Sequence, residues 1–274
     1  MQLEELLASP KALPSIPKVI ALLMSEFNRE EPDLRRISQL INTDPGLTAR
    51  VLQLANSSFF QLSRRIGAVS EALAVMGMDH VRSLVSAAAL SGAFKAVPGI
   101  QMPTFWRYSL DVAKISRALA GLVHENQGTA FTAGLLHAVG ELVMHIGMPD
   151  EIKTLDRAVS TFDPRRARAE FRTFGFAYGQ VGAGLAKAWN FPQQLVDTLQ
   201  YQHAPFDNEV YEPLAGVVHL ATWRARGREA GLPERDLVTS FPDVVGLALG
   251  LDVDAVLQQD PIDWTSGAEA GQFA

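Results

Sequence analysis

Apolar residues recur at the spacing of amphipathic helices along almost the whole chain. One set, at i, i+3, i+4, i+7 and i+11, consists of Ile16, Val19, Ile20, Leu23 and Phe27. Residues at these positions share one face of a helix. No segment shows the alternation of apolar and polar positions that is typical of a half-buried strand. The pattern therefore predicts an all-α fold.

Capping residues indicate where several helices begin and end. Asp44-Pro45 predicts an N-cap followed by a first-turn proline, and Gly77-Met78-Asp79 predicts the end of one helix and the capped start of the next. In the second part of the chain, helices are expected near residues 103–122, 128–147, 149–158, 164–174, 176–189, 192–203, 211–227 and 241–249.

A stretch rich in Pro and Gly at residues 97–103 interrupts the helical pattern. It predicts a boundary near residue 100, between an N-terminal helical subdomain (1–100) and a second helical subdomain (101–258). The remaining residues, 259–274, are rich in Gly, Ala and acids, and we expect a flexible tail whose Trp264 is able to dock on the body.

Charge is unevenly distributed along the 274 residues. The chain has 24 Lys and Arg against 30 Asp and Glu, a net charge of −6, and all six excess acids follow Leu237. The body is therefore neutral and lacks the broad basic field that nucleic-acid binding usually needs. The absence of cysteine excludes disulfides and thiolate metal sites, and it fits a reducing cytoplasm. No segment predicts a signal peptide or a membrane span, so we expect a cytoplasmic protein without membrane association.

His137, Glu141 and His145 form the most suggestive constellation. They follow at i, i+4 and i+8 in an expected helix, on roughly one face. Imidazole and carboxylate at i, i+4 can chelate a divalent ion, but the three side chains are too far apart along the helix for one ion. A metal would need ligands from other helices. The alternative is that His137 is a hydrogen-bonded core residue and that Glu141 lies at a solvated rim.

Other candidates are more isolated. His203 lies just before Pro205, at an expected helix end that suits either a site or a cap, whereas His219 reads as a satisfied residue of an apolar helix. Arg165, Arg168 and Arg172 share a helical face that suits phosphates or an acidic partner; the alternative is a solvated face that includes Glu170. The chain has no Walker loop, GxSxG or dinucleotide fingerprint, so no cofactor is expected.

Residues 44–60, DPGLTARVLQLANSSFF, resemble the signature of the HDOD family, the HD-related output domains of bacterial signalling proteins. Further landmarks of the family follow in order: LPSIP at 13–17, FWRYSL at 105–110, FTAGLLH at 131–137, VGA at 181–183, WNFP at 189–192 and VVHLA at 217–221. The resemblance spans about residues 10–225. It implies an N-terminal helical subdomain packed on a helical bundle like that of HD domains.

The same resemblance implies where the metal ligands of HD phosphohydrolases would stand. Tyr108 takes the place of the first His, His137-Ala138 of the His-Asp pair, Tyr178 of an intermediate His and Thr222 of the last Asp. Only His137 remains a ligand, with His203 as a remnant. A hydrolytic metal needs about three good nitrogen or oxygen ligands, so HD-type chemistry is not expected.

The favoured hypothesis is a non-catalytic signalling module that binds a protein partner or a small ligand. Its candidate cleft consists of Tyr108, His137, Glu141, Tyr178, His203 and Thr222. Its candidate interaction surface consists of Asn56, Ser57, Phe59, Arg165, Arg168 and Arg172. For Asn56 and Ser57 the alternative is helix capping. Two other functions stay open: a residual metal-dependent phosphohydrolase using His137, Glu141 and His203, and a nucleotide or nucleic-acid binder using the three arginines.

Overall fold

The computed structural model describes residues 2–9, 12–14, 16–57, 60, 62, 64–206 and 212–258, and every regular element in these ranges is a helix. The all-α prediction is therefore confirmed. The helices are α1 (Leu3–Leu7), α2 (Lys18–Phe27), α3 (Leu34–Asn42), α4 (Pro45–Ala55), α5 (Val69–Ala93), α6 (Met102–Leu122), α7 (Gln127–Leu136), α8 (Val139–Gly147), α9 (Pro149–Asp156), α10 (Arg166–Phe174), α11 (Tyr178–Ala188), α12 (Gln193–Tyr201), α13 (Pro213–Glu229), α14 (Glu234–Thr239), α15 (Asp243–Leu249) and α16 (Val253–Gln258).

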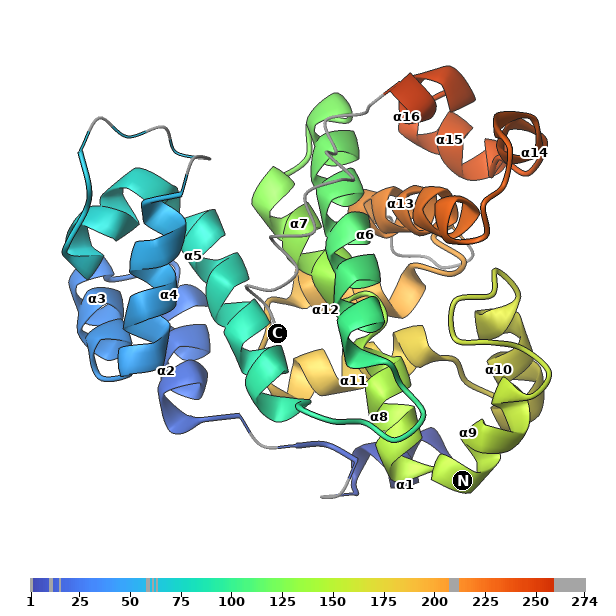
Figure 1. Cartoon of the computed structure of the whole chain (residues 1–274), viewed down its shortest axis with the longest axis horizontal. Helices are drawn as coiled ribbons and strands as arrows, with labels where there is room; N and C mark the ends of the chain where they lie inside the picture. The colour runs from blue at the N-terminus through green and yellow to red at the C-terminus, as the bar shows by residue number, and fades with distance from the viewer. Residues whose placement is uncertain are drawn as a thin grey trace.

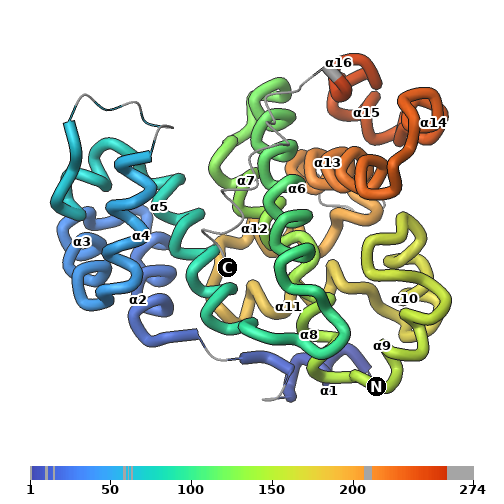
Figure 2. The backbone as a smooth tube through the Cα atoms, in the orientation of Figure 1, coloured from blue at the N-terminus to red at the C-terminus, as the bar shows by residue number. Residues whose placement is uncertain are grey.

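The N-terminal helices pack on a larger bundle, as the sequence predicted. Figures 1 and 2 show α2, α3 and α4 together at one end of the molecule, with α5 running from them toward a bundle built around α6, α7, α8, α11, α12 and α13. The first helix is an exception, because α1 lies against α11 rather than against α2–α4. The start of the chain thus contributes to the bundle.

Local signals account for two features of the N-terminal part. The carboxylate of Asp44 accepts a hydrogen bond from the amide of Leu47 at 2.9 Å, and Pro45 occupies the first turn, as expected of an N-cap. In α5, Gly77 has a non-helical φ of 72° and ψ of 167°, at a kink that joins two helical stretches. Residues other than glycine rarely adopt this positive φ. The predicted end of a helix at Gly77 is therefore confirmed.

The helix expected over 128–147 is instead two helices. α7 ends at Leu136 and α8 begins at Val139, with His137 and Ala138 in a turn between them. Just after this turn α8 approaches α11 closely, since a Cβ added at Gly140 would lie 1.9 Å from the carbonyl oxygen of Tyr178. His137 therefore leaves the helical face of Glu141, and the expected common face was wrong.

Two helical stretches are long and apolar enough to cross a membrane by length and composition alone. They are Val69–Ala93 and Gln127–Gly147, and 56% and 83% of their most apolar windows are buried inside the protein. Core helices of soluble proteins meet the same criteria, so this is weak evidence for a span. The absence of membrane association stays a prediction.

Most of the described core belongs to two clusters of buried side chains, beside a third of only three residues. The larger one joins α2–α5 to α8 and α11, and the smaller one lies between α6, α13, α15 and α16. In the smaller cluster Val245, Leu251 and Val256 are buried, so the C-terminal helices pack on α13 as expected to about Leu257. The predicted tail, 259–274, lies with Trp264 outside the described residues.

Candidate functional site

Three helices, α6, α11 and α13, and the turns after α7 and α12 bring most of the predicted cleft residues together. The rings of Tyr108, from α6, and His137, from the turn between α7 and α8, are 5.2 Å apart at their centroids. Those of Tyr178, at the start of α11, and His203, just after α12, are 4.5 Å apart. Thr222 lies buried on α13. We call this group, with Arg226, the central polar cluster; it consists of Tyr108, His137, Tyr178, His203, Thr222 and Arg226.

Arg226 is the member that sequence reasoning missed. It lies one turn after Thr222 on α13, is 8% exposed, and donates a hydrogen bond from Nη2 to Tyr178 Oη at 2.9 Å. Within the described ranges no carboxylate forms an ion pair with it. Its spacing of i+4 from Thr222, the position that the resemblance assigns to the last ligand, was the signal that could have found it.

Burial sets the charge of the central polar cluster. It lowers the pKa of His137 to about 3, against the opposing hydrogen bond to the carbonyl of Gly134, and the nearby Arg226 lowers it further. Burial lowers the pKa of His203 in the same way. It also raises the pKa of Tyr178, with Arg226 opposing. At neutral pH the cluster therefore carries one charge, the guanidinium of Arg226.

Several polar atoms of the central polar cluster make no hydrogen bond to the described residues. These buried atoms are Tyr108 Oη, His137 Nε2, His203 Nε2, Thr222 Oγ1 and Arg226 Nε. The Nδ1 of His137 donates to the carbonyl of Gly134 at 2.7 Å, so in the neutral ring Nε2 is an acceptor. Buried polar groups are normally satisfied, and such sites commonly hold ordered water.

The central polar cluster does not fit the metal ion of HD phosphohydrolases. A hydrolytic site needs about three nitrogen or oxygen ligands and negative charge to offset the cation. Here two imidazoles face two phenols and a hydroxyl, and the nearest fixed charge is positive. In the part of the chain that the structure describes, no three His, Asp or Glu side chains are grouped to hold a metal ion.

Glu141 belongs to a separate group, the ion-pair cluster, which consists of Glu141, His145, Asp156, Arg166 and Glu170. Glu141 is 1% exposed and accepts two hydrogen bonds from Arg166, each at 3.0 Å. Arg166 also donates to Glu170 and to Asp156, at 2.6 Å each. The solvated rim expected for Glu141 and the solvated face expected for Glu170 were both wrong, because both acids surround this buried guanidinium.

The charged groups of the ion-pair cluster shift one another's pKa values. Burial raises the pKa of Glu141, the neighbouring carboxylate of Glu170 raises it further, and Arg166 opposes both. Burial alone would lower the pKa of Arg166, but the two glutamates reverse this and raise it. His145 joins through Nε2, 3.2 Å from a carboxylate oxygen of Asp156. The cluster ties α8, α9 and α10 together.

The arginines of the candidate interaction surface lie apart from both clusters. Arg165, Arg168 and Arg172 are exposed at or on α10. Arg165 is partly neutralised, since its Nη2 lies 2.7 Å from a carboxylate oxygen of Asp163. Figure 1 shows α10 at the opposite end of the molecule from α2–α4. These arginines therefore cannot act together with the N-terminal signature on one small ligand.

The N-terminal candidates make hydrogen bonds that close a loop. Asn56 donates to the carbonyls of Leu52 and Ile66 at 2.7 and 2.8 Å, and accepts from the amide of Ile66 at 2.7 Å. Ser57 donates to the carbonyl of Leu54 at 2.7 Å. These contacts are those of the capping alternative. Phe59 lies outside the described residues.

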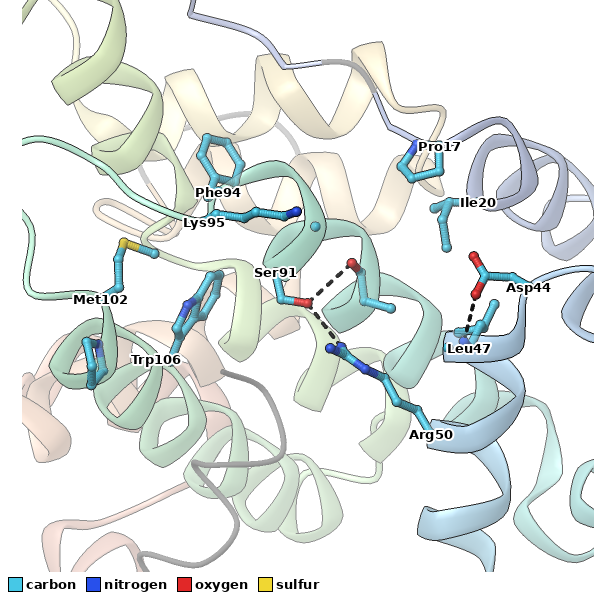
Figure 3. A pocket seen from close by; sticks show the side chains of 14 residues that line it. Pro17, Ile20, Asp44, Leu47, Arg50, Ser91, Phe94, Lys95, Met102 and Trp106 are labelled. Carbon is cyan, nitrogen blue, oxygen red and sulfur yellow. Dashed lines mark hydrogen bonds between the residues drawn. The ribbon is translucent and has the colours of Figure 1, made fainter.

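An open groove lies where the N-terminal helices meet the bundle (Figure 3). It has a volume of about 660 Å³. One wall comes from α2 and α4 and includes Ile20, Leu47 and Arg50; the other comes from the end of α5 and the start of α6. Ser91, Phe94, Lys95, Met102 and Trp106 line this second wall. The predicted cleft residues are buried elsewhere, in the bundle.

Two basic side chains border the apolar surface of the groove. Arg50 donates from Nη1 to Ser91 Oγ at 3.1 Å, across the groove, and Lys95 is exposed beside it (Figure 3). Neither forms an ion pair with a described carboxylate. The sequence did not mark the groove residues as candidates. Arg50 lies inside the 44–60 signature, however, and Trp106 lies inside the 105–110 landmark.

His219 and His203 lie near the end of α12. His219 donates from Nδ1 to the carbonyl of Gln202 at 2.8 Å, so the expectation of a satisfied residue is confirmed. His203 follows the end of α12 at Tyr201, which confirms the expected helix end before Pro205.

Solved structures similar to this chain share its fold over nearly its whole length. A protein of Shewanella amazonensis SB2B, provisionally named a phosphohydrolase, is 32% identical, with a TM-score of 0.80 over 98% of each chain. An HDOD domain protein of unknown function from Geobacter sulfurreducens is 27% identical, with a TM-score of 0.71 over 89% of this chain and 87% of that one.

Curated relatives are longer than this chain. An uncharacterized protein of Treponema pallidum is 23% identical over 84% of this chain and 45% of its own length. YuxH of Bacillus subtilis is 28% identical over 22% of this chain and 15% of its own length. The chain thus spans less than half of the curated relatives it matches.

A family model gives the assignment. The HDOD domain model matches residues 13–205, which include the 44–60 signature, α5–α12 and His137. The resemblance inferred from the sequence motifs is thereby confirmed. With most of its length matched and its N-terminal helices packed on an HD-like bundle, the chain belongs to the HDOD family.

Proposed function

We propose that this protein is a non-catalytic regulatory module of bacterial signalling, which acts by binding a protein partner in the groove. The observation that carries the proposal is the guanidinium of Arg226, buried in the central polar cluster. It lies where the resemblance to HD phosphohydrolases would put a divalent cation.

The physical reason is electrostatic. Two like charges a few ångströms apart repel by several kcal/mol when they are poorly solvated, at an effective dielectric constant of about 20. The phenols of Tyr108 and Tyr178 add no negative charge, because burial raises the pKa of both. A metal ion here would face a fixed cation with no carboxylate ligand in the cluster.

Residual phosphohydrolase activity is the main alternative, and the name of the Shewanella amazonensis relative raises it. It would use His137, Glu141 and His203. Both carboxylate oxygens of Glu141 bind Arg166. Glu141 would have to break a buried ion pair to reach a metal at His137, and breaking such a pair costs about 3–5 kcal/mol. This geometry favours the non-catalytic function.

A nucleotide or nucleic-acid ligand is the second alternative, through Arg165, Arg168 and Arg172. Their exposure on α10 allows it, but the neutral body of the chain does not favour it. Binding that weakens steeply with salt and is lost in Arg168→Glu/Arg172→Glu would support this function instead.

The groove has the features of a peptide-binding surface. Its apolar floor is continuous with the large core cluster through Ile20, Leu47, Phe94 and Trp106, so its shape is held by packed side chains. Arg50 and Lys95 provide charge at the edge. A volume of about 660 Å³ lies within the range of ordinary ligand sites, and it would hold a few side chains of a partner.

Metal content and hydrolysis test the non-catalytic part of the proposal. The protein is purified without chelators, its iron, manganese and zinc are quantified, and hydrolysis of a phosphodiester is measured with each metal added. We expect far less than one metal ion per chain and no turnover. About one ion per chain, with turnover that is lost in His137→Ala, would overturn the proposal.

A charge-reversal pull-down tests the groove. The variant Arg50→Glu/Lys95→Glu is compared with Arg168→Glu/Arg172→Glu, which changes charge equally on an exposed face far from the groove. We expect a partner that binds the wild type and the α10 variant and is lost by the groove variant, and a loss of at least tenfold in affinity with the purified partner. Equal capture by all three proteins would contradict the proposal.

A further inference from the structure

Asp44 lines the groove, where its carboxylate accepts a hydrogen bond from the amide of Leu47, but the two cations of the groove, Arg50 and Lys95, form no ion pair with a described acid. Some arginines elsewhere in this chain are paired with acids, as Arg107 is with Glu229 at 2.6 Å and Arg36 with Glu26 at 3.1 Å. Among the described residues, the neutral hydroxyl of Ser91 is the one hydrogen-bond partner of the Arg50 side chain, and no acid forms an ion pair with Lys95. Basic side chains beside an apolar floor suit a segment that combines carboxylates with a large apolar side chain.

The chain itself carries a segment of that composition. Residues 259–274 follow the end of α16 and contain no Lys or Arg. Their acids and aromatic residues are Asp260, Asp263, Trp264, Glu269 and Phe273. Aromatic side chains provide most of the binding energy in many interfaces, and acids on either side of them would meet the groove's two cations.

The segment is long enough to reach the groove. Its 16 residues span at most about 55 Å when extended. A compact chain of this length has a radius of gyration of about 19 Å, so most of the surface lies within that reach. Because the segment is tethered, its effective concentration at the groove is on the order of millimolar.

We propose that residues 259–274 dock in the groove of their own chain, with their acids toward Arg50 and Lys95 and an aromatic side chain on the floor near Trp106. A partner segment of the same acidic and aromatic chemistry displaces them. This second step rests on the proposed function, whereas the docking itself does not. The segment is then an internal competitor that raises the partner concentration needed for binding.

The size of this competition follows from mass action. If the isolated segment bound with a Kd of about 0.1 mM, a tether at about 1 mM would keep the groove roughly nine-tenths occupied. The apparent Kd of a partner would rise about tenfold. Even weak docking is therefore sufficient to regulate access.

Spin labels measure the docking in the full chain, which has no native cysteine. One label is attached at Ala96→Cys, exposed beside the groove, and the other at Thr265→Cys in the segment. We expect a narrow distribution of distances between the two labels, centred at a short distance. The distribution should become broad and longer in the Arg50→Glu/Lys95→Glu background and stay narrow in the Arg168→Glu/Arg172→Glu background.

A second comparison isolates the aromatic anchor. Trp264→Ser/Phe273→Ser should broaden the distribution without changing the fold of the body, monitored by its thermal unfolding. The proposal would be overturned by a broad distance distribution in the labelled chain without further substitutions. It would also be overturned by a narrow distribution that does not change in the Arg50→Glu/Lys95→Glu background. No partner takes part in this experiment, so its failure is distinct from a failure of the pull-down.

Discussion

Arg226 donates a hydrogen bond to the phenol oxygen of Tyr178 at 2.9 Å, at a position that the HD resemblance assigns to a metal ligand. A cation from α13 thus binds the side chain that takes the place of an imidazole on α11. The pair is buried, with Tyr178 0% and Arg226 8% exposed, so the charge is held where water does not screen it. The central polar cluster is organised around this pair.

Restoring the lost ligands should therefore fail while Arg226 is present. In the variant Tyr108→His/Ala138→Asp/Thr222→Asp, the new carboxylates would pair with the guanidinium rather than with a metal. We expect well under 0.2 metal ions per chain, rising to about one when Arg226→Leu is added, as in a site with about three N/O ligands. Added Arg228→Leu, two residues further on the same helix, is the control and should leave metal content low. Stoichiometric metal in the ligand-restored variant alone would refute the role given to Arg226.

Arg166 should be essential for stability. Arg166→Met leaves Glu141 and Glu170 buried without their shared cation, and we expect a loss of about 3–5 kcal/mol in the free energy of unfolding by urea. Arg168→Met, exposed on the same helix, should change it by no more than about 0.5 kcal/mol. Similar losses for the two variants would show that the ion-pair cluster contributes little.

His137 should make stability depend on pH. The unfolded chain takes up a proton at this imidazole below its ordinary pKa of about 6.5, whereas the folded chain does so only near pH 3. Stability from this residue is therefore complete above about pH 6.5 and is lost as the pH falls, by about 1.4 kcal/mol per pH unit. His137→Asn should reduce the slope of unfolding free energy between pH 6 and 4 by about that amount.

The comparison needs a control for lost packing. Leu142→Ala, at a fully buried position of α8, should lower stability by a similar amount at each pH and keep the wild-type slope. Glu141 acts in the opposite direction, because its raised pKa makes its contribution fall as the pH rises. It is present in both variants, so it cancels in the comparison. A slope for His137→Asn equal to that of the wild type would contradict the prediction.

Asn56 should contribute to the stability of the fold rather than to the binding of a partner. Asn56→Ala removes three hydrogen bonds that close the loop between α4 and α5, and we expect a loss of about 1–3 kcal/mol in unfolding free energy. Ser57→Ala, which removes one bond at a half-buried site, should cost less than about 1 kcal/mol. If Asn56→Ala instead keeps full stability and loses the partner, Asn56 belongs to an interaction surface.

The helices could be predicted because their signals are local. Asp44 and Pro45 act on amides one turn away, and Gly77 supplies its own positive φ. The turn at His137-Ala138 has no such signal, since apolar residues continue through it at helical spacing. What ends α7 there is tertiary packing, including the close approach of Gly140 to α11.

The charged groups could not be predicted from local pattern. Arg166 and Glu141 are 25 residues apart and meet only because α8 and α10 pack together. Within its own segment Arg166 is one arginine among several, and nothing in the spacing marks it as the buried one. The same holds for Arg226, whose surroundings come from α6, α11 and the turn after α7. The groove depends likewise on how α4 meets α6.

A cation supplied by an arginine differs from a metal ion in one respect, because it cannot dissociate. Arg226 is made with the chain, keeps its charge at every physiological pH, and needs neither uptake nor insertion. The folded state should then be equally stable in the presence of a strong chelator and under metal starvation. A signalling module built in this way would be ready as soon as it folds, in any metal supply that the cell provides.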